Sequence, residues 1–313
     1  MNLINIVSKF RTEDECIDHL IALRWPNGVC CIKCGEQNVQ EMRIEASRRK
    51  NGKLIPARRL FRCLRPECEG YQFTAKAGTI FDSSHLPLHK WFIAIGLIVE
   101  ARKGMSAKQI ARHLDMEKSY KTVWYLCHRI REAMQDGGVL SGIVEADETY
   151  MTRRKPRKGK PYVKKENTDI VLGMQARNGN LKLIPVKDTK MAIIEPQILK
   201  HISPDATLQT DESAVYWIIG ERHFPGRHRK INHSISYAVG QNHTQHIENA
   251  FSLLKRGVYG TFHHVSIKHL GRYCNEFSFR FNRREEQAQL FNSTIKGLVH
   301  GEALRFKTLI ASE

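Results

Sequence analysis

The middle of the chain carries apolar residues with helical spacing. Over residues 88–100 they form one broad face, which predicts a packed helix. Two more helices are expected over residues 107–114 and 119–134, where apolar positions recur one, three and four residues apart. A short polar turn at residues 115–118 separates these two helices. Residues 83–138 are therefore expected to form a unit of three helices.

Strand-like patterns begin after a group of glycines that ends at Gly142. They predict strands over residues 143–150, 168–175 and 181–186, a helix over 194–201 and a fourth strand over 207–213. This order is typical of a ribonuclease-H-like core, an α/β fold whose mixed sheet is flanked by helices. In such a sheet the first and fourth strands are neighbours. We expect this domain to occupy residues 141–313.

The first 82 residues differ because they hold six of the eight cysteines. Thr12 and Glu15 fit a capping box, which predicts a short helix over residues 13–23. Two cysteine pairs then lie in turn-like sequence, namely Cys31 with Cys34 and Cys63 with Cys68. Four thiolates can bind one Zn2+, which would supply folding free energy that so small a module lacks. Residues 1–82 are thus expected to form a helix and a zinc ribbon.

The other cysteines fit this picture less directly. Cys30 precedes Cys31 and could compete with it as a ligand, although the Cys-x-x-Cys spacing and the following Gly35 favour Cys31. The remaining three lie in apparent helices and are expected to be core residues: Cys16, Cys127 and Cys274.

The net charge points to a polyanionic partner. Lys and Arg outnumber Asp and Glu by 50 to 32 in the 313 residues, and phosphate contacts would use that surplus. The first 30 residues do not resemble a signal peptide. The longest apolar stretch, residues 91–99, is about half a membrane span. We therefore expect a cytoplasmic protein with no membrane partner, associated with the nucleoid when it is bound to DNA.

The three predicted helices could include a helix-turn-helix that recognises a DNA sequence. The third predicted helix would place four side chains near its N-terminal end, where a recognition helix meets the major groove: Lys118, Tyr120, Lys121 and Trp124. The alternative is a plain three-helix bundle with no role in DNA binding.

Acidic residues at strand ends indicate a metal site. Alternation puts Glu145 and Asp147 on one face of the first strand, where two buried carboxylates need a cation to offset their repulsion. Asp211 lies at the end of the fourth strand. Because these strands are expected to be neighbours, Asp147 and Asp211 can share a metal ion.

A third ligand is expected from a helix that faces the strands. Glu248 and Lys255 are seven residues apart in a helical stretch and so share a face. Glu248 can bind a second metal ion while Lys255 contacts a phosphate. Two Mg2+ or Mn2+ ions could activate a water or a 3′-hydroxyl and stabilise the leaving oxygen of an in-line displacement. The predicted catalytic residues are therefore Asp147, Asp211, Glu248 and Lys255.

Taken in order, the motifs of this chain are specific. They are Arg24-Trp25-Pro26-Asn27-Gly28, Cys31-x-x-Cys34, Gln72-Phe73-Thr74, Gly78-Thr79-Ile80-Phe81, Glu145-Ala146-Asp147-Glu148-Thr149-Tyr150, Thr210-Asp211, Ile247-Glu248, Leu254-Lys255-Arg256-Gly257 and Phe279-Arg280-Phe281-Asn282-Arg283-Arg284. Over nearly its whole length the chain resembles the zinc-ribbon-bearing DDE transposases of bacterial insertion sequences, the ISXO-like group.

That resemblance implies Mg2+-dependent strand cleavage and transfer on double-stranded DNA, with binding to the terminal inverted repeats of an element and to a target. It also implies a homo-oligomer in the DNA complex. Members of the group have Glu or Asn as the third ligand, and many place an Asn three positions before the glutamate. Here Gln245 stands at that position, so Gln245 and Glu248 both remain candidates. Phe251 matches an aromatic that often follows the glutamate.

Three other functions compete with this one. A non-catalytic DNA-binding regulator would leave the acidic strand ends without a role. A metal nuclease of the same fold, such as a junction resolvase, would cleave DNA without joining it. A decayed transposase would be folded but inactive.

Finally, the basic stretch at residues 153–160 fits either a solvated loop or a contact with DNA phosphates.

Overall fold

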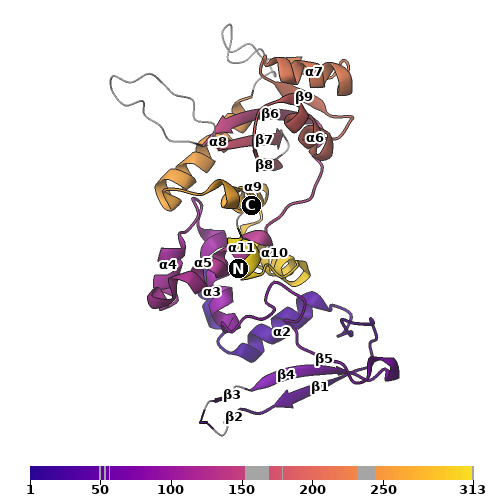
Figure 1. Cartoon of the computed structure of the whole chain (residues 1–313), viewed down its shortest axis with the longest axis vertical. Helices are drawn as coiled ribbons and strands as arrows, with labels where there is room; N and C mark the ends of the chain where they lie inside the picture. The colour runs from indigo at the N-terminus through magenta and orange to yellow at the C-terminus, as the bar shows by residue number, and fades with distance from the viewer. Residues whose placement is uncertain are drawn as a thin grey trace. The chain divides into compact units, whose positions relative to one another are not determined.

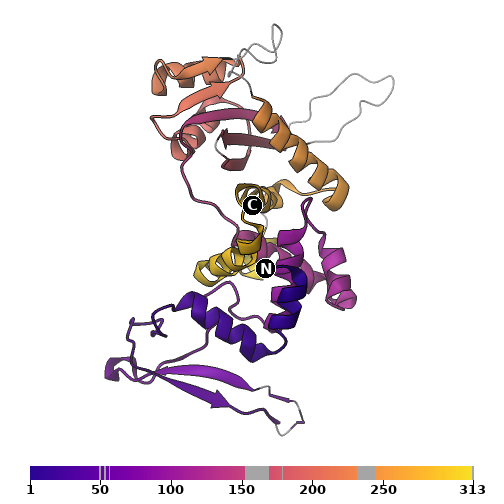
Figure 2. The same cartoon turned by 180° about the vertical axis from the view of Figure 1, so that it is seen from behind.

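The chain folds into two compact units (Figures 1 and 2). The computed structural model describes residues 1–48, 51–52, 54–55, 57–151, 169–177, 179–230 and 244–311. The ribbon unit comprises Met1–Glu100, Ala107–Ala133 and Gln287–Ser312. The sheet unit comprises Ala101–Ser106 and Met134–Glu286.

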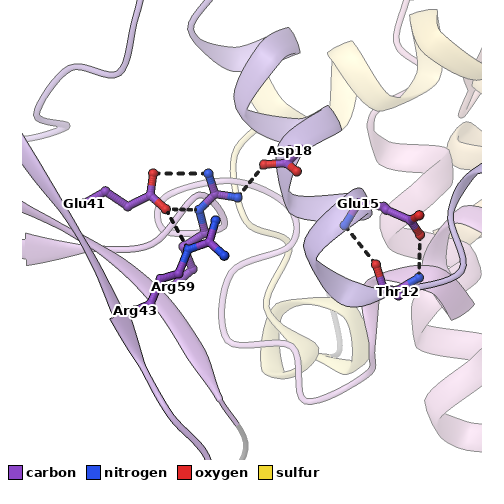
Figure 3. Close-up of polar contacts among 6 residues, drawn as sticks. All are labelled: Thr12, Glu15, Asp18, Glu41, Arg43 and Arg59. Atoms are coloured by element: carbon purple, nitrogen blue, oxygen red, sulfur yellow. Dashed lines mark hydrogen bonds and ion pairs between the residues drawn. The ribbon is translucent and has the colours of Figure 1, made fainter.

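The ribbon unit begins with two helices, α1 (Leu3–Lys9) and α2 (Glu13–Arg24). The predicted capping box is present at the start of α2, as Figure 3 shows. The Glu15 amide donates to Thr12 Oγ1 at 3.2 Å, and the Thr12 amide donates to Glu15 Oε2 at 2.8 Å. Both bonds satisfy amides that have no partner inside a helix. Helix α1 was not anticipated from the sequence.

A long antiparallel hairpin follows, made of β1 (Val39–Ile44) and β4 (Arg58–Cys63). The short strand β5 (Gln72–Phe73) pairs with β4, and β2 (Ser47–Arg48) pairs with β3 (Leu54–Ile55). Arg59 of β4 forms ion pairs with Glu41 of β1 and with Asp18 of α2 (Figure 3). Its side chain is only 11% exposed, so these carboxylates compensate its charge and tie the hairpin to α2.

The three helices predicted after the ribbon are all present. They are α3 (Leu88–Glu100), α4 (Ala107–His113) and α5 (Tyr120–Glu132), with a 3₁₀ turn at Glu117–Ser119. The apolar stripe predicted for the third helix is buried, and it includes Cys127, which is fully inaccessible. Lys118, Tyr120 and Lys121 are exposed.

Two C-terminal helices also belong to the ribbon unit: α10 (Gln287–His300) and α11 (Phe306–Ile310). Phe291 of α10 packs edge-on against Phe92 of α3, with ring centroids 5.6 Å apart. Phe10 completes this aromatic cluster. The segment 141–313 expected as one catalytic domain is therefore divided, because its last helices bury their apolar face in the ribbon unit.

The sheet unit contains five strands in the order β10-β9-β6-β7-β8. They are β6 (Ile143–Tyr150), β7 (Ile170–Ala176), β8 (Leu181–Val186), β9 (Thr207–Thr210) and β10 (His228–Lys230). The central pairings β6–β7 and β7–β8 are antiparallel, whereas β9 is parallel to β6 and β10 is parallel to β9. The predicted first and fourth strands are thus neighbours. This mixed sheet is compatible with a ribonuclease-H-like core.

Helices cover both faces of this sheet (Figure 1). On one face, α6 (Met191–His201) and α7 (Ala214–His223) pack against Val144 and Ala146. On the other face lie α8 (Gln245–Gly257), a π-helical turn η3 (Val258–Phe262) and α9 (Ile267–Asn282). Cys274 of α9 is a core residue, as expected.

Two further expectations concern a membrane partner and the basic stretch at residues 153–160. Across the described ranges, every helix is too short or too polar to cross a membrane. The basic stretch 153–160 lies outside the described residues.

Candidate functional site

The four predicted zinc ligands lie together in the ribbon unit. The sulfurs of Cys31, Cys34, Cys63 and Cys68 are all within 4.8 Å of one another. The Sγ atoms of Cys34 and Cys63 are 3.8 Å apart, and a tetrahedron with Zn–S bonds of about 2.3 Å has edges of about 3.8 Å. The arrangement therefore fits a single Zn2+ ion.

Two tight turns present these sulfurs. In the first, the Gly35 amide donates to the Cys31 carbonyl at 2.8 Å, and Gly35 adopts a φ of 76° that favours glycine. In the second, a 3₁₀ turn at Pro66–Cys68 is followed by Glu69 in the left-handed conformation. The local sequence thus folds both turns, and the pairing of β4 with β1 and β5 holds them together.

The thiols have opposing pKa shifts. A hydrogen bond from the backbone of Glu36 lowers the pKa of Cys34 to about 7. The hydrogen bond with Cys34 and then burial raise the pKa of Cys68 to about 12. Four thiolates at this spacing repel one another, and a divalent cation would offset that repulsion. Cys30 is not a member of the cluster, so the structure favours Cys31.

In the sheet unit, Asp147 lies on β6 and Asp211 directly follows the neighbouring strand β9, at the equivalent position along the chain direction. Glu145 of β6 is in register with Gln209 of β9 in this parallel pair, and each Asp lies two residues further along its strand direction. Side chains two residues apart share a face. Asp211 also accepts a hydrogen bond from the Ser213 amide at 3.0 Å, which orients its carboxylate at the start of α7.

Asp147 is the most strongly perturbed of these acids. Burial raises its pKa to about 7, and the negative charges of Glu148, Asp211 and Glu248 add to the effect. A hydrogen bond from the Glu148 backbone, which lowers the pKa, offsets this only in part. The three predicted acids are therefore close enough to interact.

A cleft between β6 and α8 contains most of the predicted catalytic residues. It is lined by Asp147, Glu148, Thr149, Glu248, Phe251, Ser252, Lys255, Arg256, Tyr259 and Gly260. Glu248 and Lys255 share a face of α8, as the spacing predicts, so acids and cations line the same cleft. Asp211 is not among the lining residues, but its negative charge contributes to the raised pKa of Asp147. Gln245 is exposed at the first turn of α8 and is outside this lining.

The close packing of α8 on the sheet depends on Gly173 of β7. Gly173 is paired with Asp147 across the β6–β7 ladder. A Cβ atom at this position would lie 2.5 Å from Phe251 and 2.6 Å from Ile247. The absence of a side chain at Gly173 therefore lets α8 approach the strand that carries Asp147.

Glu145 has a different environment from the one expected. Its side chain is fully buried, and its partners are protein groups. Oε2 accepts from the amides of His246 and Ile247 at 3.0 and 3.2 Å. Oε1 accepts from His246 Nδ1 at 2.8 Å and from Arg177 Nε at 3.3 Å, while Arg177 Nη2 donates to Gln209 at 2.7 Å. The Arg177 guanidinium is therefore the cation that offsets the charge of Glu145, and this carboxylate has protein partners where a metal ion was expected.

Glu148 is an acid of the cleft that the sequence analysis did not single out. Its Oε2 accepts a 2.6 Å hydrogen bond from the hydroxyl of Tyr216 in α7. Burial, followed by the nearby Asp211 charge, raises the pKa of Glu148. Alternation along β6 puts Glu148 and Asp147 on opposite faces, which is why the pattern gave no signal for it.

Comparisons with known proteins place both regions among transposases. Residues 139–282 match a family model described as the ISXO2-like transposase domain. Residues 11–70 match one described as the transposase zinc-ribbon domain. The first match contains all three predicted acids, and the second contains all four clustered cysteines.

Curated relatives agree with these matches. The chain is 24% identical over 290 residues to an uncharacterized protein in transposable element ISH50 of Halobacterium salinarum, covering 88% of this chain and 92% of that protein. It is 30% identical over 118 residues to an uncharacterized transposase-like protein of Haemophilus influenzae, covering 38% of this chain and 92% of that protein.

Proposed function

Because the chain belongs to the ISXO2-like transposase family, we propose that it binds the ends of its insertion sequence, cleaves DNA strands there and joins them to target DNA. The observation that carries this proposal is that Asp147 and Glu248 line one cleft and that the charges of Asp211 and Glu248 both act on Asp147. Burial is the main cause of the raised pKa of Asp147, and the negative charges of Glu148, Asp211 and Glu248 add to it. Divalent cations that prefer oxygen ligands would offset these charges.

The donor set fits Mg2+ or Mn2+. Asp147 on β6 and Asp211 just after β9 would hold one ion, and Glu248 would complete the site for a second. When bound, two such ions supply a Lewis acid for the scissile phosphate and for the leaving oxygen. Lys255 lines the same cleft two turns further along α8, where its ammonium group would position a DNA phosphate.

Recognition of the ends is assigned to the ribbon unit. Helices α4 and α5 and the turn between them form the helix-turn-helix, with the exposed Lys118, Tyr120 and Lys121 at the leading end of α5. The zinc ribbon would add a second contact with the duplex. Because two element ends must be processed together, we expect the protein to act as a homo-oligomer on DNA.

A direct test uses the purified full-length protein and duplexes taken from the DNA that flanks its reading frame. With Mg2+, the protein is expected to nick these end duplexes and to join the 3′ ends to a target plasmid, as resolved on sequencing gels. Asp147→Asn and Asp211→Asn should abolish both products. Glu195→Gln, a change of an acid on α6 that pairs with His223, is the matched control.

The products also separate the rival functions. Cleavage of branched duplexes without joining would identify a resolvase-like nuclease. Binding of end DNA with no metal-dependent product, in wild type as in the Asp variants, would identify a regulator or a decayed enzyme.

A further inference from the structure

We propose that Glu145 is a positioning residue that fixes the N-terminus of α8 against β6 and thereby sets where Glu248 lies relative to Asp147. The inference rests on the proposed function only for its catalytic consequence, because the contact itself is independent of DNA and metal. Glu145 is two residues from Asp147 on the same strand face, and His246 is two residues from Glu248 at the start of α8.

The first turn of α8 lacks a conventional cap. A helix begins with amides that have no partner within it. The residue at the N-cap position, Thr244, makes no side-chain bond to these amides, and its hydroxyl donates to Glu248 Oε1 at 3.2 Å instead. The missing acceptor comes from the sheet, where Glu145 Oε2 accepts from the amides of both His246 and Ile247. A carboxylate at this end also interacts favourably with the helix dipole.

The other oxygen of Glu145 extends the contact to the neighbouring strand. Oε1 accepts from the His246 ring and from Arg177, which directly follows β7. Arg177 in turn donates to Gln209 of β9, two residues before Asp211. One buried carboxylate therefore links three parts of the site: the strand of Asp147, the strand of Asp211 and the helix of Glu248.

Gly173 and Glu145 constrain α8 in complementary ways. The contact at Gly173 sets the distance between the sheet and the side chains of Ile247 and Phe251. The two amide bonds to Glu145 fix the start of the helix along its axis, because an axial shift would break both bonds. Metal ligands and catalytic groups need placement to within about 0.5 Å, and that precision comes from the residues that support them.

Glu145 is poorly suited to bind the metal ion itself. Each of its oxygens already accepts from two protein donors, at distances of 2.8 to 3.3 Å. A metal ion on either oxygen would compete with these donors and leave them buried without an acceptor, which is costly. The carboxylate is therefore assigned to the support of α8.

The test is Glu145→Gln in the full-length protein, with Glu195→Gln as the matched control. A glutamine fills the same volume, but its NH2 group must face either the two amides or the Arg177 guanidinium, all of which are donors. In metal-free protein without DNA, hydrogen–deuterium exchange of the His246 and Ile247 amides is expected to become roughly tenfold faster. Half-maximal cleavage is expected to need about 10- to 100-fold more Mg2+.

Unchanged exchange in Glu145→Gln would overturn the proposal, as would faster exchange with an unchanged Mg2+ requirement. Should Glu145→Gln not fold, His246→Ala replaces it, because this half-exposed ring can be removed while both amides remain. Because the ring also holds the Glu145 carboxylate, this variant is expected to speed exchange of both amides and to raise the Mg2+ requirement, each by less than about tenfold. No change in either quantity would again overturn the proposal. Wild-type protein that shows no Mg2+-dependent cleavage would refute the proposed function, while the exchange comparison would still decide the role of Glu145.

Discussion

Gly173 lies directly across the β6–β7 ladder from Asp147, and the space a side chain would need there is filled by Phe251 and Ile247 of α8. The glycine on one strand therefore controls how closely the helix carrying Glu248 approaches the acid on the next. This pair connects the packing of the core to the geometry of the candidate active site.

Gly173→Ala should thus impair both stability and activity. The new methyl group would overlap Phe251, and relieving the overlap requires α8 to move outward. We expect a loss of about 1–3 kcal/mol in the free energy of unfolding, together with a loss of cleavage that excess Mg2+ restores only in part. Urea unfolding and a cleavage assay measure the two effects. Gly271→Ala on α9 is the control, since its Cβ would meet only Pro185 at 3.9 Å; equal behaviour of the two variants would contradict the argument.

Asp147→Asn should stabilise the metal-free protein at high pH. The pKa of Asp147 is raised from 3.8 to about 7, so folding favours its protonated form. That favourable contribution is complete below pH 3.8 and is lost as the pH rises through 7. At pH 8 the free energy of unfolding of the variant should therefore exceed that of wild type by on the order of 4 kcal/mol, at roughly 1.4 kcal/mol per pKa unit, with a smaller difference at pH 5. Urea unfolding at the two pH values decides this, and a difference that grows towards acid would refute it.

Substitutions on α8 should identify the third acidic ligand. Asp147→Ala and Asp211→Ala are expected to reduce cleavage and joining on the order of 1,000-fold or more while DNA binding persists or improves, since a negative charge near phosphates is removed. Glu248→Ala should match them and Gln245→Ala should be mild, because Glu248 lines the cleft whereas Gln245 does not. Lys255→Ala should cost about 100-fold. If Gln245→Ala lost far more activity than Glu248→Ala in the same assay, the third ligand would be Gln245.

Removal of one cysteine ligand should release zinc. Cys34→Ser is expected to lower the zinc content from one ion per chain to less than half and to lower the melting temperature, because zinc binding contributes to folding of the ribbon. Cys30→Ser should retain the ion, since Cys30 lies outside the cluster. Elemental analysis of the purified variants measures the content. Zinc loss in Cys30→Ser with retention in Cys31→Ser would exchange the two assignments.

Lys121→Ala should weaken binding to end DNA and reduce its salt dependence. The residue is exposed near the start of α5, and loss of one phosphate contact lowers the slope of log K against log salt by about 1. Fluorescence anisotropy across a salt series provides the slope. Lys190→Ala, an exposed lysine of the sheet unit paired with Asp188, should leave the slope unchanged. Equal effects of both variants would place the recognition surface elsewhere.

Short-range features of this protein could be predicted from its sequence. Strand β6 has the predicted bounds, residues 143–150, because alternation along a strand depends only on successive residues. The capping box of Thr12 and Glu15 formed because its partners are three residues apart. The cysteine spacing predicted the cluster for the same reason, since each pair forms its own turn. Glu248 and Lys255 share a face because helical periodicity fixes it.

Long-range partners were decided only by the tertiary structure. Glu145 was predicted to need a metal cation, but it pairs with Arg177 and with His246, which is 101 residues away, and no local pattern relates these residues. The spacing favoured Cys31 over Cys30, and the cluster of four sulfurs in the folded chain confirmed it. Helix α10 belongs to the ribbon unit because Phe291 packs against Phe10 and Phe92 of that unit. The periodicity of a sequence fixes which side of an element is apolar or acidic, whereas packing of the whole chain determines which other element that side meets.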